Sequence, residues 1–248
     1  MGKKKLFVVS DIHSFYTPLL EALDKAGFDK NNESHYLIVC GDAFDRGPDS
    51  VDVLHFLMSL DRKILIKGNH DDMFEMLCKR GFPQYYDHTN GTVGTIEQLG
   101  GIEDNKSFED CCDIAMSRTQ AYRDSLINYF ETKNYIFVHA WIPVNGTNGM
   151  GYSYKENWRN CTEQEFYESR WPNGMKCARD GAIEPNKTII CGHWHCSWGW
   201  AMDEERSEFG KDAEWNPYYG KGIIAIDRCT AHTGEVNVLV LEDEFLEV

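Results

Sequence analysis

Apolar runs alternate with amphipathic stretches over the first third of the chain. The runs in 5–11, 35–42 and 62–71 are rich in β-branched residues and end in polar residues, which is typical of buried strands. The stretches 17–28, 48–60 and 73–81 carry apolar residues at helical spacing. In the first of them Thr17 is the predicted N-cap, Pro18 the first helical residue and Gly27 the end. This order predicts a parallel sheet with helices on its faces.

The rest of the chain is less regular. Residues 84–134 lack clear strand patterns and are expected to be mostly helical. Strand patterns return in 134–141, 187–195, 221–228 and 235–243. No internal repeat, low-complexity segment or linker divides the chain. We therefore expect one domain over 1–248, with a mostly helical insertion at about 84–134.

Composition excludes some classes of protein. Of the 248 residues, 42% are hydrophobic and 13% aromatic, which is enough for a sizeable core and excludes a disordered chain. The formal net charge of −15 disfavours long nucleic acids and anionic membrane surfaces as partners. Nine cysteines without a CxxC pair, no apolar run of membrane-spanning length and no signal-peptide core predict a reduced, cytoplasmic protein.

Aspartate, asparagine and histidine recur where the predicted strands end. The stretch CGDAFDRG, residues 40–47, is the densest example, with two aspartates and an arginine directly after an apolar run. Ligands of parallel sheets bind beyond the carboxyl ends of the strands, so we expect these side chains to converge. They are Asp11 and His13, then Asp42, Asp45 and Arg46, then Asn69 and His70, and finally His139, His193 and His195.

The donor types and their spacing point to metal ions. Asp11 and His13 are two positions apart, as are His193 and His195, and in extended backbone such pairs project on one side. Carboxylate and imidazole donors without a thiolate suit Mn²⁺, Fe or Zn²⁺. The donors suffice for two ions that share a carboxylate, which is a common arrangement for in-line displacement at phosphorus.

The motifs, taken in order, carry a family resemblance. DIH, GDAFDRG, GNHD, VHAW and CGHWH resemble the signature of calcineurin-like metallophosphoesterases, and the second and third resemble its phosphoprotein phosphatase branch. The resemblance is continuous from Lys5 to about Gly81 and resumes at Tyr135, Thr188 and Ile223. It implies an α/β fold, a four-layer α-β-β-α sandwich with two mixed sheets.

The resemblance also implies a role for each residue. Two divalent ions, Mn²⁺ first and Fe or Zn²⁺ as alternatives, would hold a bridging hydroxide that attacks phosphorus. His70 would protonate the leaving group and Asp45 would orient it, while Arg46 and Asn69 would contact the substrate. Arg170 is the candidate for a second phosphate-binding arginine, with Arg159 and Arg179 as alternatives. The first ion would be bound by Asp11 and His13, the second by Asn69, His139 and His193, and both by Asp42.

His195 departs from the phosphatase branch. That branch has no ligand at this position, whereas other members of the superfamily use a GHxH motif whose last histidine completes the shell of the first ion. His195 is therefore either a further ligand or a residue that packs beside Trp194. Trp194, Trp198 and Trp200 either stack on an aromatic part of a substrate or fill the core below the site.

Three functions remain open. The first is hydrolysis of phosphate monoesters, as a serine/threonine-type protein phosphatase whose partner is a phosphorylated protein or a small phosphate ester. The second is hydrolysis of dinucleoside polyphosphates or phosphodiesters. The third is a non-catalytic, metal-binding interaction protein, which the presence of both His70 and Asp45 disfavours because neither is expected to bind a metal.

Overall fold

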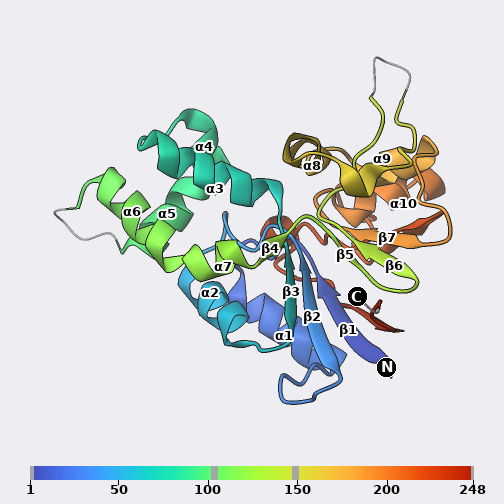
Figure 1. The fold of residues 1–248 in the computed structure, drawn as a ribbon, viewed down its shortest axis with the longest axis horizontal. Coiled ribbons are helices and arrows are strands. Elements are labelled where there is room, and N and C mark those ends of the chain that lie inside the picture. The colour runs from blue at the N-terminus through green and yellow to red at the C-terminus, as the bar shows by residue number, and fades with distance from the viewer. Residues whose placement is uncertain (1–2, 102–105, 147–150, 247–248) are drawn as a thin grey trace.

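The chain forms two five-stranded sheets in a computed structural model that describes residues 3–101, 106–146 and 151–246 (Figure 1). In the first sheet β1 to β4 are parallel and β10 pairs antiparallel with β1. Val9 of β1 is level with Val39 of β2, and Cys40 of β2 with Ile66 of β3, so these strands end at one edge. The strands are, in sheet order, β10 (Leu239–Asp243), β1 (Lys4–Val9), β2 (His35–Cys40), β3 (Lys63–Ile66) and β4 (Leu126–Ile127).

The second sheet has a parallel centre and antiparallel edges. Strands β6, β7 and β9 run parallel, while β5 and β8 pair antiparallel with β6 and β9. The strands are, in sheet order, β5 (Phe130–Glu131), β6 (Tyr135–Phe137), β7 (Thr188–Cys191), β9 (Ile223–Ala225) and β8 (Tyr218–Gly220).

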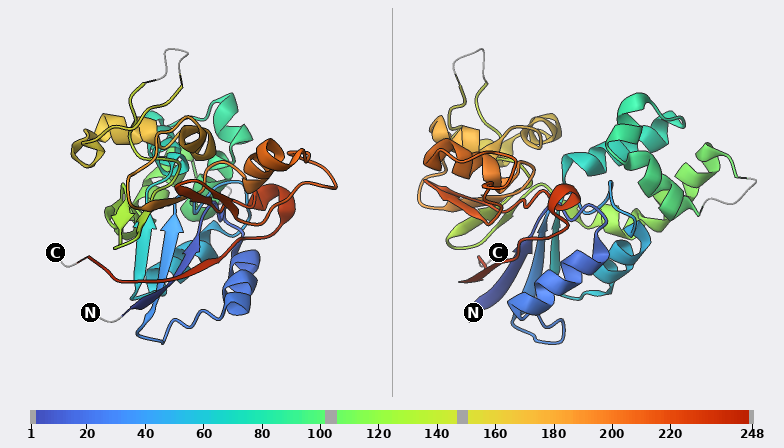
Figure 2. Two further views of the ribbon diagram at one scale, coloured as in Figure 1. Left: turned by 90° about the vertical axis from the view of Figure 1, so that its right-hand side faces the viewer. Right: turned by 180° about the vertical axis from the view of Figure 1, so that it is seen from behind.

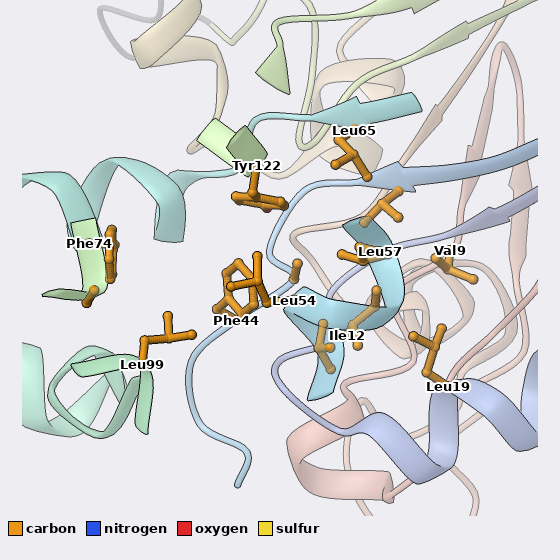
Figure 3. Close-up of a cluster of buried hydrophobic side chains, with 14 of the residues drawn as sticks. Val9, Ile12, Leu19, Phe44, Leu54, Leu57, Leu65, Phe74, Leu99 and Tyr122 are labelled. Atoms are coloured by element: carbon orange, nitrogen blue, oxygen red, sulfur yellow. The ribbon is translucent and has the colours of Figure 1, made fainter. Parts of the chain in front are cut away.

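Alternate residues of the strands divide between two faces, and this division produces four layers. On β1, Phe7 and Val9 join the cluster under α1 (Tyr16–Ala26) and α2 (Ser50–Ser59), part of which Figure 3 shows. Leu6 and Val8 point the other way, into a cluster that contains Phe137 and Ile190 of the second sheet. The outer face of the second sheet is covered by α9 (Gly174–Arg179) and α10 (Cys196–Glu204). The predicted α-β-β-α sandwich with two mixed sheets is confirmed.

Two predicted helix starts were wrong. Helix α1 begins at Tyr16 after an N-cap at Phe15, so Thr17 is not the cap. Pro18 lies in the first turn of α1, where a backbone N–H would have no acceptor within the helix. The missing N–H of proline therefore costs no helical hydrogen bond. Gly27 ends the helix in a left-handed conformation, as predicted. Helix α3 (Asn69–Arg80) begins four residues before the predicted start at 73, which places Asn69 and His70 in its first turn.

The helices of 84–134 gather beside α3, away from the second sheet (Figures 1 and 2). The stretch also contains the short strands β4 and β5. The chain between β6 and β7 contains the 3-10 helix η1 (Trp158–Asn160) and α8 (Glu163–Ser169), and α11 (Thr230–Thr233) follows β9. Of the helices in the described residues, none is long and apolar enough to span a membrane. The helices of 84–134 are α4 (Tyr85–Thr89), α5 (Thr92–Gly100), α6 (Phe108–Arg118) and α7 (Gln120–Asp124).

Candidate active site

The turns after β1, β2 and β7 place the predicted ligands in an unusual backbone conformation. Asp11, His13, Asp42 and His193 have φ angles of 48°, 52°, 51° and 65°. Residues other than glycine seldom adopt this left-handed region, and such strain clusters at functional sites. The expectation that Asp11 and His13 share one side of an extended strand was therefore wrong, because tight turns bring them together instead.

Three glycines make room for these side chains. A Cβ atom at Gly68 would lie 2.0 Å from Asp42 Oδ1, and one at Gly192 would lie 2.1 Å from Asp11 Oδ2. A Cβ atom at Gly41 would lie 2.3 Å from the ring nitrogen Nδ1 of His139. The glycines of CGDAFDRG, GNHD and CGHWH thus allow the backbone of one strand end to approach the ligands of another.

Asp42 lies at the centre of two groups of donor atoms. His13, Asp42 and His70 form one group, and Asp42, His139 and His193 form the other, with the donor atoms of each within 4.8 Å of one another. Asp42 Oδ2 is 3.4 Å from His139 Nε2, which is 2.8 Å from Asn69 Oδ1. Asp42 and His139 are at most 2% exposed. The structure therefore brings a carboxylate, an amide and imidazoles from five chain segments to one place.

Three of the histidines are oriented as metal ligands usually are. His13 Nδ1, His139 Nδ1 and His193 Nε2 each lie 2.9 Å from a backbone carbonyl oxygen, of Phe44, Cys40 and Trp171 respectively. When each of these nitrogens donates its proton to the carbonyl, the other ring nitrogen keeps a lone pair. That lone pair is available to a metal ion in the donor groups around Asp42. Metal-binding histidines in proteins are generally held in this way. The donor set therefore fits two divalent ions that share Asp42.

The electrostatics of the buried ligands agree with this assignment. Burial, with Arg46 nearby, holds the pKa of His13 well below its usual range, and burial lowers the pKa of His193 to about 3. Both imidazoles are thus neutral, as metal binding requires. Burial raises the pKa of Asp11 to about 6, although its Oδ2 accepts a hydrogen bond of 2.9 Å from the His193 N–H. The charged form of Asp11 is therefore costly here without a cation beside it. Burial also acts against the charge of Asp42, but the surrounding histidines outweigh burial and hold its pKa below the usual range.

His70 and Asp45 form a buried pair at the edge of the first group. His70 Nδ1 lies 2.6 Å from Asp45 Oδ2. Burial alone would lower the pKa of His70, but the carboxylates of Asp42 and Asp45 outweigh that effect and raise it. An imidazolium with a raised pKa is suited to donate a proton. The pairing that the family resemblance implied is thus present in the structure.

Sequence reasoning missed two threonines that hold Asp45. The hydroxyls of Thr92 and Thr95 donate to Asp45 Oδ2 and Oδ1, each over 2.7 Å, and Thr95 Oγ1 accepts from the Asp45 N–H over 3.0 Å. Both threonines are buried on α5. Helix α5 therefore holds the Asp45 carboxylate, which in turn bonds to His70. No motif near Asp45 signals this contact, since the partners are 47 and 50 positions away.

Arg46 points its guanidinium into the site. Its Nη1 is 2.8 Å from His13 Nε2 and its Nη2 is 3.2 Å from His70 Nε2. These partners are ring nitrogens rather than carboxylates, so the positive charge of Arg46 is not neutralised by them. It is placed to bind an anion beside the metal ligands.

A cleft of about 490 Å³ opens above these groups. Polar side chains form its floor, and aromatic and apolar side chains form its walls. Among the residues that line it are Asp11, His13, Asp42, Arg46, Asn69, His70, His193, Met73, Met76, Tyr86, Tyr167, Trp171 and Trp194.

Arg170 is paired with carboxylates, and its role as a second phosphate-binding arginine stays a prediction. Its Nη1 donates to Asp72 Oδ2 over 2.8 Å and its Nη2 to Glu163 Oε1 over 2.7 Å. The side chain is 4% exposed, and it is not among the described residues that line the cleft. The two alternatives are paired as well, Arg159 with Glu131 and Glu184 and Arg179 with Asp203. Opposite charges close to each arginine decide where these guanidinium groups lie.

His195 also lies apart from the donor groups. Its Nε2 is 2.7 Å from Glu208 Oε1, and its ring stacks on Trp194 and contacts Phe209. Since β7 ends at Cys191 and His193 has a positive φ, His193 and His195 are not on one side of an extended strand, contrary to expectation. Trp194 lines the cleft, whereas Trp198 and Trp200 pack against the core of the second sheet. A ligand role for His195 stays a prediction.

Comparison with known proteins agrees with this geometry. The family described as calcineurin-like phosphoesterase matches residues 4–197. The chain belongs to this family. Among curated relatives, symmetrical bis(5′-nucleosyl)-tetraphosphatases from Buchnera aphidicola and Pseudomonas fluorescens are 31% and 28% identical to it over 133 and 142 residues. These alignments cover 53% and 57% of this chain but only 39% and 44% of the relatives' own lengths.

Solved structures share the fold. A putative diadenosine tetraphosphatase has a TM-score of 0.53 and 17% identity, with 99% of this chain and 95% of that chain covered. A protein serine/threonine phosphatase from Saccharomyces cerevisiae has a TM-score of 0.57 and 15% identity, with 99% and 81% covered. At these identities the likeness concerns the fold alone.

Proposed function

We propose that this member of the family is a metal-dependent phosphohydrolase that cleaves dinucleoside polyphosphates. The observation that carries the proposal is the double use of Asp42, which belongs to two groups of metal-binding donors on the floor of one cleft. Pairs of ions that share a carboxylate are suited to displacement at phosphorus. The same floor carries a guanidinium and an imidazole–carboxylate pair.

The residues that would hold the ions come from the two donor groups together with the family pattern, which adds Asp11 and Asn69 and assigns His70 to proton transfer instead. Asp11, His13 and Asp42 would bind one ion, and Asp42, Asn69, His139 and His193 the other. Two divalent ions supply Lewis-acid charge and an activated water for attack on phosphorus. Oxygen and imidazole donors suit Mn²⁺, and Fe or Zn²⁺ as alternatives.

The chain's own residues perform the remaining steps. Arg46 binds the oxygens of the phosphoryl group through the fork of its guanidinium. His70, charged because of Asp42 and Asp45, donates the proton that the leaving phosphate oxygen takes up as the bond breaks. Asp45 keeps the His70 ring in this orientation and stabilises its positive charge, and Thr92 and Thr95 keep Asp45 in place.

The substrate class is inferred from the cleft and the relatives together. The curated relatives are named as symmetrical bis(5′-nucleosyl)-tetraphosphatases. The walls of the cleft carry aromatic rings, which suit a nucleoside better than the small side chain of a phosphoserine. A protein serine/threonine phosphatase, our first expectation from the motifs, is supported beyond them only by a fold likeness. It therefore becomes the second candidate.

One experiment separates the candidates. Metal-stripped protein is assayed with and without Mn²⁺ on diadenosine tetraphosphate, a phosphoserine peptide and bis(p-nitrophenyl) phosphate. We expect Mn²⁺ to restore cleavage of the dinucleotide, and chromatography to show ADP as the nucleotide product. Turnover of the peptide without cleavage of the dinucleotide would favour the protein phosphatase. No turnover of any of the three would remove the enzyme proposal.

A further inference from the structure

The cleft above the donor groups has an aromatic wall on each side. Helices α3 and α4 provide Met73, Met76 and Tyr86 on one side. On the other side, α8 provides Tyr167, and Trp171 follows two residues after the end of that helix. Figure 1 shows that α8 lies on the side of the second sheet and that α3 and α4 lie on the opposite side. The metal-binding side chains form the floor between the two walls.

Three of these wall side chains are open to solvent. Met76 is 42% exposed, Trp171 39% and Tyr86 38%. Large apolar groups that are exposed together around a polar floor mark a ligand site rather than a part of the core. Aromatic rings at such sites stack on nucleobases without regard to their sequence.

Both walls are held in position without a ligand. On one side, the Trp171 carbonyl oxygen is 2.9 Å from His193 Nε2, and the neighbouring Arg170 is paired with Asp72 of α3. On the other side, Arg80 bonds to the Tyr86 hydroxyl and lies 5.3 Å from the centre of its ring. Walls that are ordered in advance lose little conformational entropy on binding.

We propose that Trp171 and Tyr86 form two separate aromatic subsites, one on each side of the metal centre, which bind the two bases of one dinucleoside polyphosphate. The proposal rests on the proposed function and deepens it. A ligand held by a base at each end has its phosphate chain stretched over the floor, with Arg46 and the metal-binding side chains beneath it. A mononucleotide uses only one subsite, and an inorganic polyphosphate uses neither.

Binding constants test the two subsites directly. The full chain, in a His70→Asn background that slows turnover, is titrated calorimetrically in Mn²⁺ with diadenosine tetraphosphate, ATP and inorganic tetraphosphate. We expect the dinucleotide to bind more tightly than ATP. Trp171→Ala and Tyr86→Ala are each expected to weaken dinucleotide binding by about tenfold, the loss of one base–aromatic stack. Neither change should alter the binding of tetraphosphate.

Matched variants separate stacking from damage to the fold. Trp171→Phe and Tyr86→Phe keep a ring, so dinucleotide binding should stay near that of the parent. Tyr85, the neighbour of Tyr86, is 84% exposed and is not among the described residues that line the cleft, so Tyr85→Ala should change nothing. Equal binding of dinucleotide and tetraphosphate, or unchanged dinucleotide binding in both alanine variants, would overturn the two subsites.

The same series keeps the two proposals distinguishable. If the chain with His70 intact cleaves the dinucleotide but the alanine variants bind it normally, the subsites are wrong and the proposed function stands. If the ring-dependent losses are found but the intact chain cleaves no dinucleotide, the subsites are right and the proposed function fails.

Discussion

The functional residues come from two regions that reach the cleft in different ways. In 5–81 every predicted site residue follows β1, β2 or β3 within a few positions, and all of them gather at the cleft or directly behind it. Between β6 and β7 the chain makes a long excursion. Of the residues predicted there and at the strand ends beside it, His139 and His193 join the donor groups, whereas Arg170 does not line the described cleft. The register of the sheet thus determines where a side chain at a strand end lies. In the long connection between β6 and β7, neighbouring charges determine where a side chain such as that of Arg170 lies.

Two arginines show the difference most clearly. Arg46 is one residue from Asp45 in the turn after β2, and its guanidinium meets the ring nitrogens of His13 and His70. Arg170 follows α8, and its guanidinium meets the carboxylates of Asp72 and Glu163. A guanidinium already matched by carboxylates has little attraction left for a phosphate.

The largest effect expected is the loss of the shared ligand. Asp42→Asn removes a donor from both groups, so we expect turnover of any substrate to fall by about a thousandfold or more, since metal ions contribute several kcal/mol to the transition state. Bound Mn²⁺, measured by atomic emission, should fall as well. Asp52→Asn, a change of an exposed carboxylate on α2, is the control. Normal turnover by Asp42→Asn would contradict the shared site.

Substitution of Arg170 should reduce stability, whereas substitution of Arg46 should reduce activity. Arg170→Met removes one of the two cations paired with the buried Asp72, while Lys67 stays 2.8 Å from its Oδ1. This loss should lower the free energy of unfolding by about 2 kcal/mol and the melting temperature by about 4 to 8 °C. Arg46→Met should leave the melting temperature nearly unchanged and reduce kcat/KM by about a hundredfold, the loss of a charge-assisted contact to phosphate. A normal melting temperature together with reduced activity in Arg170→Met would contradict the assignment of Arg170 to the buried ion pair.

Metal removal should make stability depend on pH through Asp11. Burial raises the pKa of Asp11 from 3.8 to about 6, so the folded state holds this proton more tightly than the unfolded chain. The free energy of unfolding of metal-free protein should therefore fall as the pH rises from about 4 to about 6, by about 2 to 3 kcal/mol from this group. Denaturant unfolding at several pH values measures it. Metal-free Asp11→Asn should lack this part of the fall, and an equal fall in both proteins would refute the assignment.

The threonines of α5 should matter through His70. Thr92→Val with Thr95→Val removes three hydrogen bonds, two to the Asp45 carboxylate and one from the Asp45 N–H. We expect kcat for an alkyl phosphate, a poor leaving group, to fall by about tenfold. The loss should be smaller for p-nitrophenyl phosphate, because its leaving group needs less protonation. His70→Asn should show the same pattern with a larger loss. Equal losses on both esters would mean that the threonines do not act through the proton donor.

The smallest effect is expected at His195. Because its ring is bonded to Glu208, His195→Gln should leave the Mn²⁺ content unchanged, whereas His193→Gln should reduce it. Metal analysis of the two variants side by side gives the answer. A loss of metal in His195→Gln would show that the ring leaves Glu208 to bind an ion, and it would restore the GHxH interpretation.

The alternation of apolar runs with amphipathic stretches determined the layers of this protein. On β1 alone, Leu6 and Val8 face one core and Phe7 and Val9 the other, and the order of the strands in the chain made a parallel sheet predictable. The turn motifs then placed Asp11, His13, Asp42, Asn69 and His70 at one edge. These features could be predicted because they depend on local periodicity and on the common direction of parallel strands.

Only the tertiary structure decided what lies around that edge. The hydroxyls on Asp45, the carboxylates around Arg170, the bond between His195 and Glu208 and the facing walls at Tyr86 and Trp171 all join segments without a shared local pattern. Such contacts depend on which side chains happen to be nearest once the layers have packed. Spacing along the chain carries no information about that distance. The gathering of the candidate metal ligands was therefore predictable and their surroundings were not.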